Sequence, residues 1–316
     1  MEYNHIPVML PEVLENLEIK AGKNYLDGTL GGGGYTRAIA RLADPGIVLS
    51  TDEDVLAIHH NEEIIKQKKI KNVILVNGNF QNLQTICKTE AARNLKFNGL
   101  VLDLGLSSAQ LEDRSRGFSF KLLASPLDMA FAGQSAKIST QEIVNTWSKV
   151  ELLKIIKEYG EESYAWRIVE RIIETRKTKN IATVGDMLEL LERTLPNSVL
   201  NKKGIHWATK TFQGLRIATN RELEVLEQVL NDSLNFLEKD SNIVVVSYHS
   251  LEDRIVKNFF RDAAKNCICP PESPICICQN KAKIKIITKK AVLPSNDEVK
   301  NNPRARSAKL RAAKII

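Results

Sequence analysis

Short apolar runs rich in β-branched residues recur along the chain, and most of them end at an acidic residue or a turn. The five runs are Tyr25–Leu26, Ile47–Thr51, Val73–Val76, Gly99–Leu102 and Ile243–Val246. Helical patterns separate the first four. Runs of this length between helices are typical of buried parallel strands joined by crossover helices. The pattern therefore predicts an α/β fold built on a parallel sheet.

The gap between the fourth and fifth runs is too long for a single crossover connection. Within it, residues 142–176 and 183–194 follow a helical pattern, and residues 221–237 form a further amphipathic helix that leads into the fifth run. We therefore predict a discontinuous sheet domain, residues 1–108 and 206–316. Residues 109–205 would be an inserted, mostly helical domain, with 196–204 as the linker back.

The stretch from Tyr25 to Tyr35 predicts a strand, a glycine turn and the start of a helix. Such a turn lets a nucleotide-like cofactor approach the backbone, with free N–H groups at the helix start. The dinucleotide pattern G-x-G-x-x-G fails, because Thr36 or Arg37 occupies its last position. An acid before the turn, here Asp27, is instead common where S-adenosylmethionine binds. The alternative is a flexible surface loop.

Further candidate ligands follow the other predicted strands. Asp52 can accept both hydroxyls of a ribose, or it can cap the next helix. Phe80 can lie against an adenine ring or belong to the core. Asp103 ends the fourth strand, just before Ser107 and Ser108, and can receive a hydrogen bond from an amine. These positions converge, because ligands of open α/β sheets bind beyond the carboxyl ends of the strands.

The charge of the chain is concentrated at one end. The chain has 316 residues and a formal net charge of +7, and residues 281–316 hold eleven Lys or Arg against two Asp or Glu. This basic segment predicts a polyanionic partner such as RNA, or a merely solvated tail. No apolar stretch approaches the roughly 20 residues of a membrane span. Residues 1–5 lack the pattern of a signal peptide, so we expect a cytoplasmic protein without a membrane partner.

Four of the five cysteines lie close together in the sequence. Cys267, Cys269, Cys276 and Cys278 form two C-x-C pairs separated by six residues that include prolines. Four thiolates can close a tetrahedral zinc site, although C-x-x-C is the more usual spacing. The alternative is a loop of reduced cysteines, since disulfides are rare in cytosolic proteins.

Nine motifs in order make the whole chain similar to the bacterial family that methylates the N4 amine of a cytosine in small-subunit (16S) ribosomal RNA. They are residues 5–10 (HIPVML), 27–35 (DGTLGGGGY), 102–111 (LDLGLSSAQL), 116–120 (RGFSF), 126–129 (PLDM), 159–162 (YGEE), 211–217 (TFQGLRI), 249–254 (HSLEDR) and 303–311 (PRARSAKLR).

The resemblance implies a Rossmann-like methyltransferase sheet with an inserted helical domain that binds substrate. It also implies S-adenosylmethionine contacts at Gly33, Gly34, Tyr35, Asp52, Phe80, Asp103 and Gln110. Three positions depart from the family pattern: Tyr35 stands for a frequent His, Ala130 for a usual Arg and Trp207 for a usual Pro. The implied partner is the assembled or nearly assembled small subunit, and the implied target lies in its decoding region.

The chemistry of a nitrogen target agrees with the residues present. A cytosine amine is a weak nucleophile that must be positioned in line with the methyl group. Asp103, Ser107 and Ser108 are candidates for this positioning, and His249 can contact the base or a phosphate, or simply end its strand. Methylation at carbon 5 would need a cysteine nucleophile near the strand ends, where none is expected.

Two other classes of function stay open from the sequence alone. One is a methyltransferase for a small molecule or a protein, and the other is a non-catalytic ribosome-binding factor that kept the fold. Ser250 and Asp253 have the spacing of a helix capping box, so we expect these two residues to be structural.

Overall fold

Seven strands form one sheet in the part of the chain that the computed structural model describes, namely residues 7–89, 92, 94–133, 136–270 and 276–316. His5 and Ile6 of the first motif lie outside these residues. The strands are β1 (Asn24–Asp27), β2 (Val48–Asp52), β3 (Val73–Asn77), β4 (Phe97–Asp103), β5 (Leu237–Ser247), β6 (Ile284–Ile286) and β7 (Lys309–Ile315).

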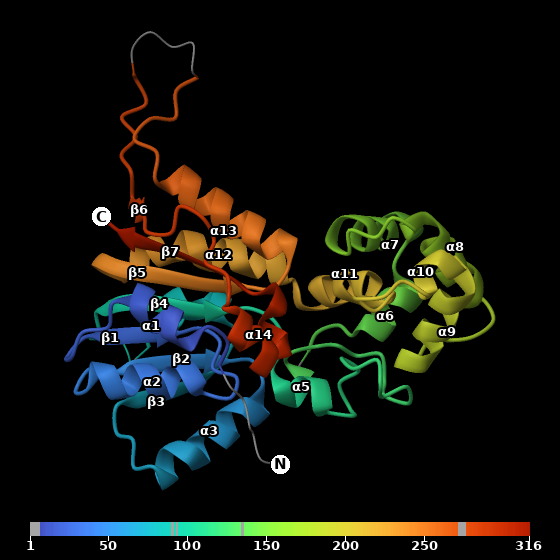
Figure 1. Cartoon of the computed structure of the whole chain (residues 1–316), viewed down its shortest axis with the longest axis horizontal. Coiled ribbons are helices and arrows are strands. Elements are labelled where there is room, and N and C mark those ends of the chain that lie inside the picture. Colours follow the sequence, from blue (N-terminus) through green and yellow to red (C-terminus); the bar gives the residue numbers. More distant parts are fainter. Residues whose placement is uncertain (1–6, 90–91, 93, 134–135, 271–275) are drawn as a thin grey trace. The chain divides into compact units, whose positions relative to one another are not determined.

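The strand order is β3-β2-β1-β4-β5-β7-β6. The first five strands run parallel, and β7 is antiparallel to both β5 and β6. Four of the five predicted runs lie wholly in strands, and the run Ile47–Thr51 begins one residue before β2. The expected α/β fold on a parallel sheet is confirmed (Figure 1). β6 and β7 have no counterpart in the sequence prediction.

Helices flank this sheet and bury its two faces separately. They are α1 (Leu10–Leu17), α2 (Gly34–Ala43), α3 (Val55–Gln67), α4 (Leu83–Ile86), α12 (Glu222–Phe236), α13 (Ser250–Ala263) and α14 (Asn296–Asn301), with the short helices η1 (Phe80–Asn82) and η4 (Pro303–Ser307). Successive residues of a strand point to opposite faces. Accordingly, Leu100 and Leu102 pack in one core with α12 and α13, whereas Val101 packs in another with α1 and α2.

The chain divides into two compact units, Met1–Gly105 with Leu223–Ile316, and Leu106–Glu222. The second unit is helical. Its elements are α5 (Ser108–Glu112), α6 (Thr140–Thr146), α7 (Lys149–Lys154), the π-helix η3 (Ile155–Tyr159), α8 (Ala165–Thr175), α9 (Val184–Thr194), α10 (Asn197–Leu200) and α11 (Thr209–Asn220). We predicted a return to the sheet domain at residue 206. The structure instead assigns α11 to the helical unit, because Phe212 and Leu215 pack in the core of that unit.

Two of the sequence motifs meet inside the second unit. A Cβ added to Gly160 would lie 2.5 Å from the carbonyl oxygen of Lys210, and one added to Gly214 would lie 2.5 Å from that of Ile155. Glycine at both positions lets α11 approach η3 at backbone distance. The amide of Gln213 then donates a hydrogen bond to the carbonyl of Tyr159 at 3.0 Å. These contacts explain both glycines without any role in the reaction.

Part of the basic C-terminal segment belongs to the sheet, because β6 and β7 lie within residues 281–316. Phosphate binding by the rest of this segment stays a prediction. Nε of Arg311 lies 2.6 Å from Asp253 Oδ1, and Nζ of Lys309 lies 3.5 Å from Asp253 Oδ2. Nζ of Lys314 lies 2.7 Å from a carboxylate oxygen of Glu18. All three positive charges of β7 are therefore paired within the fold. In the described ranges, no helix is long and apolar enough to cross a membrane.

Candidate active site

The carboxyl ends of four parallel strands meet at one edge of the sheet, and a polar residue stands at each end. Asp27, Asp52 and Asp103 end β1, β2 and β4, and Ser247 ends β5. The strand register pairs Asp27 with Val101, and Asp103 with Val246. Because ligands of open α/β sheets bind beyond this edge, it is the candidate active site.

Asp27 is fully buried and holds the glycine turn from within. The backbone N–H of Thr29 donates to Asp27 Oδ1 at 3.1 Å, and the hydroxyl of Thr36 donates to Oδ2 at 2.6 Å. Burial raises the pKa of Asp27, and these hydrogen bonds oppose the increase. The hydroxyl of Thr29 also accepts a hydrogen bond from the N–H of Asp103 at 2.7 Å. Asp27 thus supports the shape of the turn, and a direct cofactor contact at this residue stays a prediction.

Two side chains that the sequence did not point to brace the glycine turn. Arg37 Nη1 donates to the carbonyl of Gly32 at 2.8 Å and to Asn61 Oδ1 at 2.9 Å. Asn61 Nδ2 donates to the carbonyl of Gly31 at 2.9 Å. Gly33 has φ +71°, and a Cβ there would lie 1.9 Å from Asn61 Oδ1. Position 33 therefore needs glycine for both its conformation and its space.

The turn ends at the start of α2, whose first residue is Gly34. The preceding residue supplies no side-chain cap, so N–H groups of the first turn are available to an anionic group of a ligand. Tyr35 has a buried ring, and its hydroxyl donates a hydrogen bond to the carbonyl of Val8. The Tyr35 side chain therefore joins the N-terminal segment to α2. A side-chain hydrogen bond with Tyr35 also lowers the pKa of Asp103, and a cofactor contact at Tyr35 stays a prediction.

Asp52 lies beside the turn and is held by two backbone donors. The N–H of Gly31 donates to Oδ2 at 2.8 Å, and the N–H of Asp54 donates to Oδ1 at 2.9 Å. Burial raises the pKa of Asp52 to about 6, and these two hydrogen bonds lower it. Each carboxylate oxygen accepts more than one hydrogen bond, so Asp52 keeps capacity for hydroxyl donors. The cap of α3 is made by Asp54 instead, whose carboxylate accepts the N–H of Leu56.

Phe80 begins η1, three residues after the end of β3, and is half-buried beside the turn. A Cβ added to Gly28 would lie 3.2 Å from Cβ of Phe80 and 2.5 Å from Cδ2 of Leu102. Close by, Asn79 Nδ2 donates to a carboxylate oxygen of Glu53 at 2.5 Å. Burial raises the pKa of Glu53, against that hydrogen bond. Glu53 directly follows Asp52, so it adds an acid at the β2 end that was not among the predicted site residues.

Asp103 at the end of β4 meets a partner from the end of β5. The hydroxyl of Tyr248 donates to Asp103 Oδ1 at 2.7 Å. Burial raises the pKa of Asp103 to about 7, and the hydrogen bond from Tyr248 opposes that increase. The negative charges of Asp27 and Glu252 raise the pKa further. A side-chain hydrogen bond with Tyr35 also lowers this pKa, so Asp103 is a carboxylate with a pKa near neutrality that is contacted by two tyrosines.

His249 and Glu252 form the capping box of α13, which corrects the expected pair Ser250 and Asp253. The N–H groups of Tyr248 and His249 donate to Glu252 Oε2 at 2.8 and 3.2 Å. The carboxylate of Asp253 instead accepts a hydrogen bond from Nε of Arg311 in β7. Nε2 of His249 lies 3.1 Å from Glu252 Oε1, in a geometry that makes no hydrogen bond. The predicted contact of His249 with a base or a phosphate stays a prediction.

Ser107 and Gln110 belong to the second unit and bond each other. The N–H of Gln110 donates to Ser107 Oγ at 3.2 Å, and the N–H of Ser107 donates to Gln110 Oε1 at 3.0 Å. This capping box starts α5. The side chain of Ser108 lies outside what the structure describes. The predicted roles of Ser107 in catalysis and of Gln110 in cofactor binding are untested by this geometry, which commits both side chains to the helix start.

Cys87 is unsuited to act as a nucleophile at this edge. It follows α4 and packs against the core that contains Leu83 and Ile86. Burial raises the pKa of its thiol to about 12, so the thiolate is scarce at neutral pH. Among the described residues, the remaining cysteines lie between α13 and β6, away from the four strand ends.

The groups at this edge fit S-adenosylmethionine, a ligand with a ribose, an adenine, a sulfonium and an amino-acid end. Asp52 offers acceptors for hydroxyls, Phe80 offers an aromatic ring, and the uncapped start of α2 offers N–H donors to a carboxylate. Asp103 adds a carboxylate whose ionised form a cationic ligand favours, because opposite charges lower a carboxyl pKa. These residues therefore offer a suitable contact for each part of S-adenosylmethionine.

The sequence matches known proteins along its full length. Residues 2–316 match the model of the MraW methylase family. Three similar curated proteins all carry the name Ribosomal RNA small subunit methyltransferase H. Those of Finegoldia magna and Clostridioides difficile are 43% and 40% identical over 317 residues, with both chains fully covered. That of Halothermothrix orenii is 44% identical over 315 residues, covering 99% of this chain and 98% of its own.

A match of this extent accounts for the glycine turn, the three acidic strand ends and the helical unit together. The chain therefore belongs to the MraW methylase family and is an S-adenosylmethionine-dependent methyltransferase.

Proposed function

We propose that this methyltransferase transfers a methyl group to the N4 amine of a cytosine in the decoding region of small-subunit ribosomal RNA. The observation that carries the proposal is the full-length similarity to relatives named as small-subunit ribosomal RNA methyltransferases. It is supported by a carboxylate, Asp103, at the strand end where the reacting amine has to be positioned.

The cofactor is held by the residues that surround the glycine turn. Asp52 accepts the ribose hydroxyls, and the ring of Phe80 lies against the adenine. The backbone of Gly33, Gly34 and Tyr35 supplies N–H donors to the amino-acid end. Support for these roles comes from the uncapped start of α2 and from the two N–H groups that fix the Asp52 carboxylate.

Asp103 orients the target amine and takes its proton. When bound, S-adenosylmethionine supplies an electrophilic methyl group on a sulfonium. Asp103 accepts a hydrogen bond from the amine, which aligns the nitrogen lone pair with that methyl group. The nitrogen carries an excess proton after the transfer, and Asp103 accepts it, because a carboxylate with a pKa of about 7 can both take up and release a proton near neutral pH. Tyr248 keeps one oxygen of Asp103 in place throughout.

Nitrogen rather than carbon is the target because the strand ends hold carboxylates and no described cysteine. Carbon-5 methylation needs a thiolate that adds to the ring. The protonated, core-packed thiol of Cys87 does not meet that need.

The substrate is the assembled or nearly assembled small subunit in the cytoplasm, where a target base is already unstacked. Single-stranded or flipped bases cost less to present to an active site than stacked ones. The helical unit 106–222 supplies substrate-binding surface, and exposed lysines such as Lys285, Lys289 and Lys290 supply phosphate contacts.

Nucleoside mass spectrometry tests the proposal. Small subunits from cells that lack the gene are incubated with the purified protein and S-adenosylmethionine, and their RNA is digested to nucleosides. We expect N4-methylcytidine to appear with assembled subunits and to be weaker with naked RNA. The appearance of 5-methylcytidine would contradict the mechanism, and the absence of any modified cytidine would contradict the substrate. A parallel reaction with Asp103→Ala separates enzymatic product from background.

A further inference from the structure

The described residues between α13 and β6 leave the sheet as two extended strands of chain, and we call residues 264–270 and 276–283 the arm (Figure 1). The arm has no apolar core in its described part: Ile268 is 63% exposed and Ile277 is 82% exposed. Hydrogen bonds join its two sides near the base, where Asn280 Nδ2 donates to the carbonyl of Lys265 at 2.6 Å. A segment with so little buried apolar surface needs another source of order.

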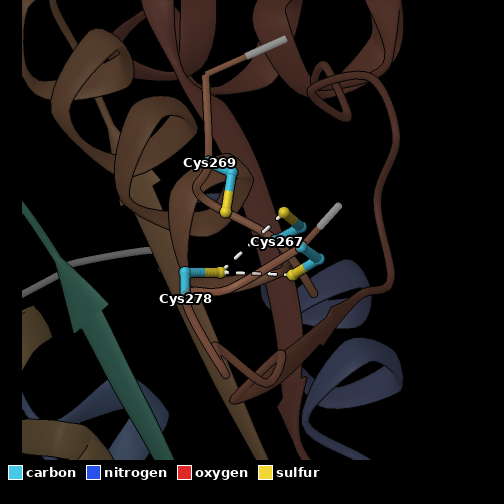
Figure 2. A group of neighbouring side chains, drawn as sticks. Cys267, Cys269 and Cys278 are labelled. Carbon is cyan, nitrogen blue, oxygen red and sulfur yellow. Dashed lines mark hydrogen bonds between the residues drawn. The ribbon is translucent and has the colours of Figure 1, made fainter. Parts of the chain in front are cut away.

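Four sulfur atoms converge in this arm. The Sγ atoms of Cys267, Cys269, Cys276 and Cys278 all lie within 4.8 Å of one another, and the three labelled side chains point toward a common centre (Figure 2). Sγ of Cys278 lies 3.6 Å from that of Cys276 and 3.8 Å from that of Cys267. A disulfide would bring two sulfurs to about 2.05 Å. The four cysteines are therefore free thiols.

These distances match the edges of a metal-centred tetrahedron. Ligands at about 2.3 Å from a tetrahedral zinc ion lie about 3.8 Å from one another. Each C-x-C pair contributes two corners, one pair from each side of the arm. The N–H of Ile268 also donates to Sγ of Cys278 at 3.4 Å, which links the two sides. Hydrogen bonds of this kind to ligating groups are a usual feature around protein metal centres.

We propose that the arm binds one structural zinc ion through the thiolates of Cys267, Cys269, Cys276 and Cys278. Four sulfur ligands suit zinc and leave no open position, so the ion has no part in catalysis. Binding releases four thiol protons and leaves a centre of net charge −2. Lys281 and Lys283 are exposed and follow Cys278 by three and five residues, so positive charge stands close in the chain. The zinc site takes the place of the missing apolar core.

Metal analysis of the full chain tests this site. The protein is purified without chelator, and zinc is measured by mass spectrometry of the ashed sample. We expect about one zinc per chain in the wild type and a loss of at least ten-fold in Cys276→Ser/Cys278→Ser. The matched control is Ile277→Ser, which changes the exposed residue between the two ligands and should keep the full zinc content. Cys87→Ala should also keep it.

Two further measurements distinguish a zinc site from four cysteines that bind no metal. Cobalt substitution should give the intense visible bands of a tetrahedral thiolate site in the wild type and in Ile277→Ser, but not in the double cysteine variant. Chelation of the zinc should speed tryptic cleavage at Lys281 and Lys283, while the rest of the chain stays resistant.

Three results would overturn the proposal. The first is a wild type that is purified without zinc and takes up none when titrated with zinc sulfate against a chromophoric chelator. The second is a double cysteine variant with the zinc content of the wild type. The third is iron with inorganic sulfide, or an oxidised disulfide pair, in place of zinc.

Discussion

Asp103 ends β4 and Tyr248 directly follows β5, far away in the sequence, and their hydrogen bond sets the chemistry of the candidate active site at the level of single residues. Burial moves the pKa of Asp103 toward neutrality, and the hydroxyl of Tyr248 limits that shift. The pair therefore links the protonation state of one carboxyl to the geometry of its neighbour. Two consequences can be measured.

Tyr248→Phe removes the hydroxyl and keeps the ring, which lies against Gly105. A hydrogen bond to a charged group contributes about 1.5–3 kcal/mol, so we expect kcat to fall by about 10- to 100-fold. The pH at half-maximal kcat should rise, because the lost hydrogen bond lowered the pKa of Asp103. The measurement is kcat against pH at saturating cofactor and substrate.

The matched control for that measurement is Tyr25→Phe. Tyr25 is a buried tyrosine in β1 whose hydroxyl accepts the N–H of Lys20 at 2.8 Å, away from the strand ends. It should lose stability without moving the pH profile. If the pH at half-maximal kcat does not change in Tyr248→Phe, the Tyr248 hydroxyl does not influence the pKa of Asp103.

Asp103→Asn should make the protein more stable at neutral pH. The carboxyl has a pKa of about 7 in the folded state and an ordinary value near 3.8 when unfolded. The folded state therefore binds more protons between these values, and stability falls as the pH rises through them. The variant avoids this loss, which amounts to about 1–4 kcal/mol above pH 7.

Urea unfolding at pH 4 and pH 8 measures that difference. The variant should exceed the wild type in free energy of unfolding at pH 8 and match it more closely at pH 4. Equal differences at both pH values would show that Asp103 is not destabilised by its ionisation. Methyl transfer by the variant should be impaired at every pH, since Asn accepts no proton.

Reasoning from the sequence found Asp103 but not Tyr248, for a physical reason. An acid that ends an apolar run is visible in one short stretch. The role of Tyr248 exists only because β4 and β5 are neighbours, which brings the residue after one strand to the residue that ends the other. Arg37 and Asn61 were missed in the same way, because they brace the glycine turn from two different helices.

The glycine turn is the element on which cofactor binding depends, and its shape is set by backbone conformation and by bracing side chains. Gly33→Ala should weaken S-adenosylmethionine binding by more than ten-fold. A left-handed alanine costs about 1–2 kcal/mol, and its Cβ would also displace the Asn61 side chain that holds the turn. Titration calorimetry at fixed pH gives the affinity.

Gly22→Ala is the matched control for this element. Gly22 has φ +77°, close to that of Gly33, but nothing lies within 4 Å of an added Cβ. It should lose a similar amount of stability from backbone strain and keep the cofactor affinity of the wild type. If Gly33→Ala and Gly22→Ala bind S-adenosylmethionine with the same affinity, the contacts of Asn61 with the glycine turn do not contribute to cofactor binding.

Elements differ in how far the sequence revealed them. The five parallel strands were predicted because each contains a short apolar run, although β3, at the edge of the sheet, is only half-buried. β7 was missed because Lys309, Arg311 and Lys314 interrupt its apolar positions and resemble a basic tail. Its charges are paired with Asp253 and Glu18, which lie far away in the sequence. The capping box of α13 was misplaced by one residue, since His249 is a less common cap than Ser250.

At the scale of the whole molecule, the sheet depends on its antiparallel strand. Deleting residues 303–316 removes β7 from between β5 and β6 and leaves Asp253 without Arg311. We expect the truncated chain to lose cooperative thermal unfolding. By contrast, Lys289→Glu/Lys290→Glu changes exposed residues outside the strands and should leave the melting temperature within a few degrees.

RNA binding by the double lysine variant then reports on phosphate contacts alone. Each lost contact should reduce the slope of log affinity against log salt by about one unit. A folded truncation variant would contradict the structural role of β7, and an unchanged salt slope in the lysine variant would contradict phosphate binding at these lysines.

In the sequence, the helical unit is inserted between β4 and β5, two strands that pair with each other, and this insertion has a kinetic consequence. Leu102 of β4 pairs with Val245 of β5, and the whole of residues 106–222 lies between them. Closing so long a loop is entropically costly while it is unfolded. The unit has its own core, so its early collapse shortens the effective loop before the strands pair. Refolding should therefore show two phases, with the helical unit completing before the sheet. Variants that loosen the core of the unit should slow the pairing of β4 with β5 and hence the assembly of the strand ends.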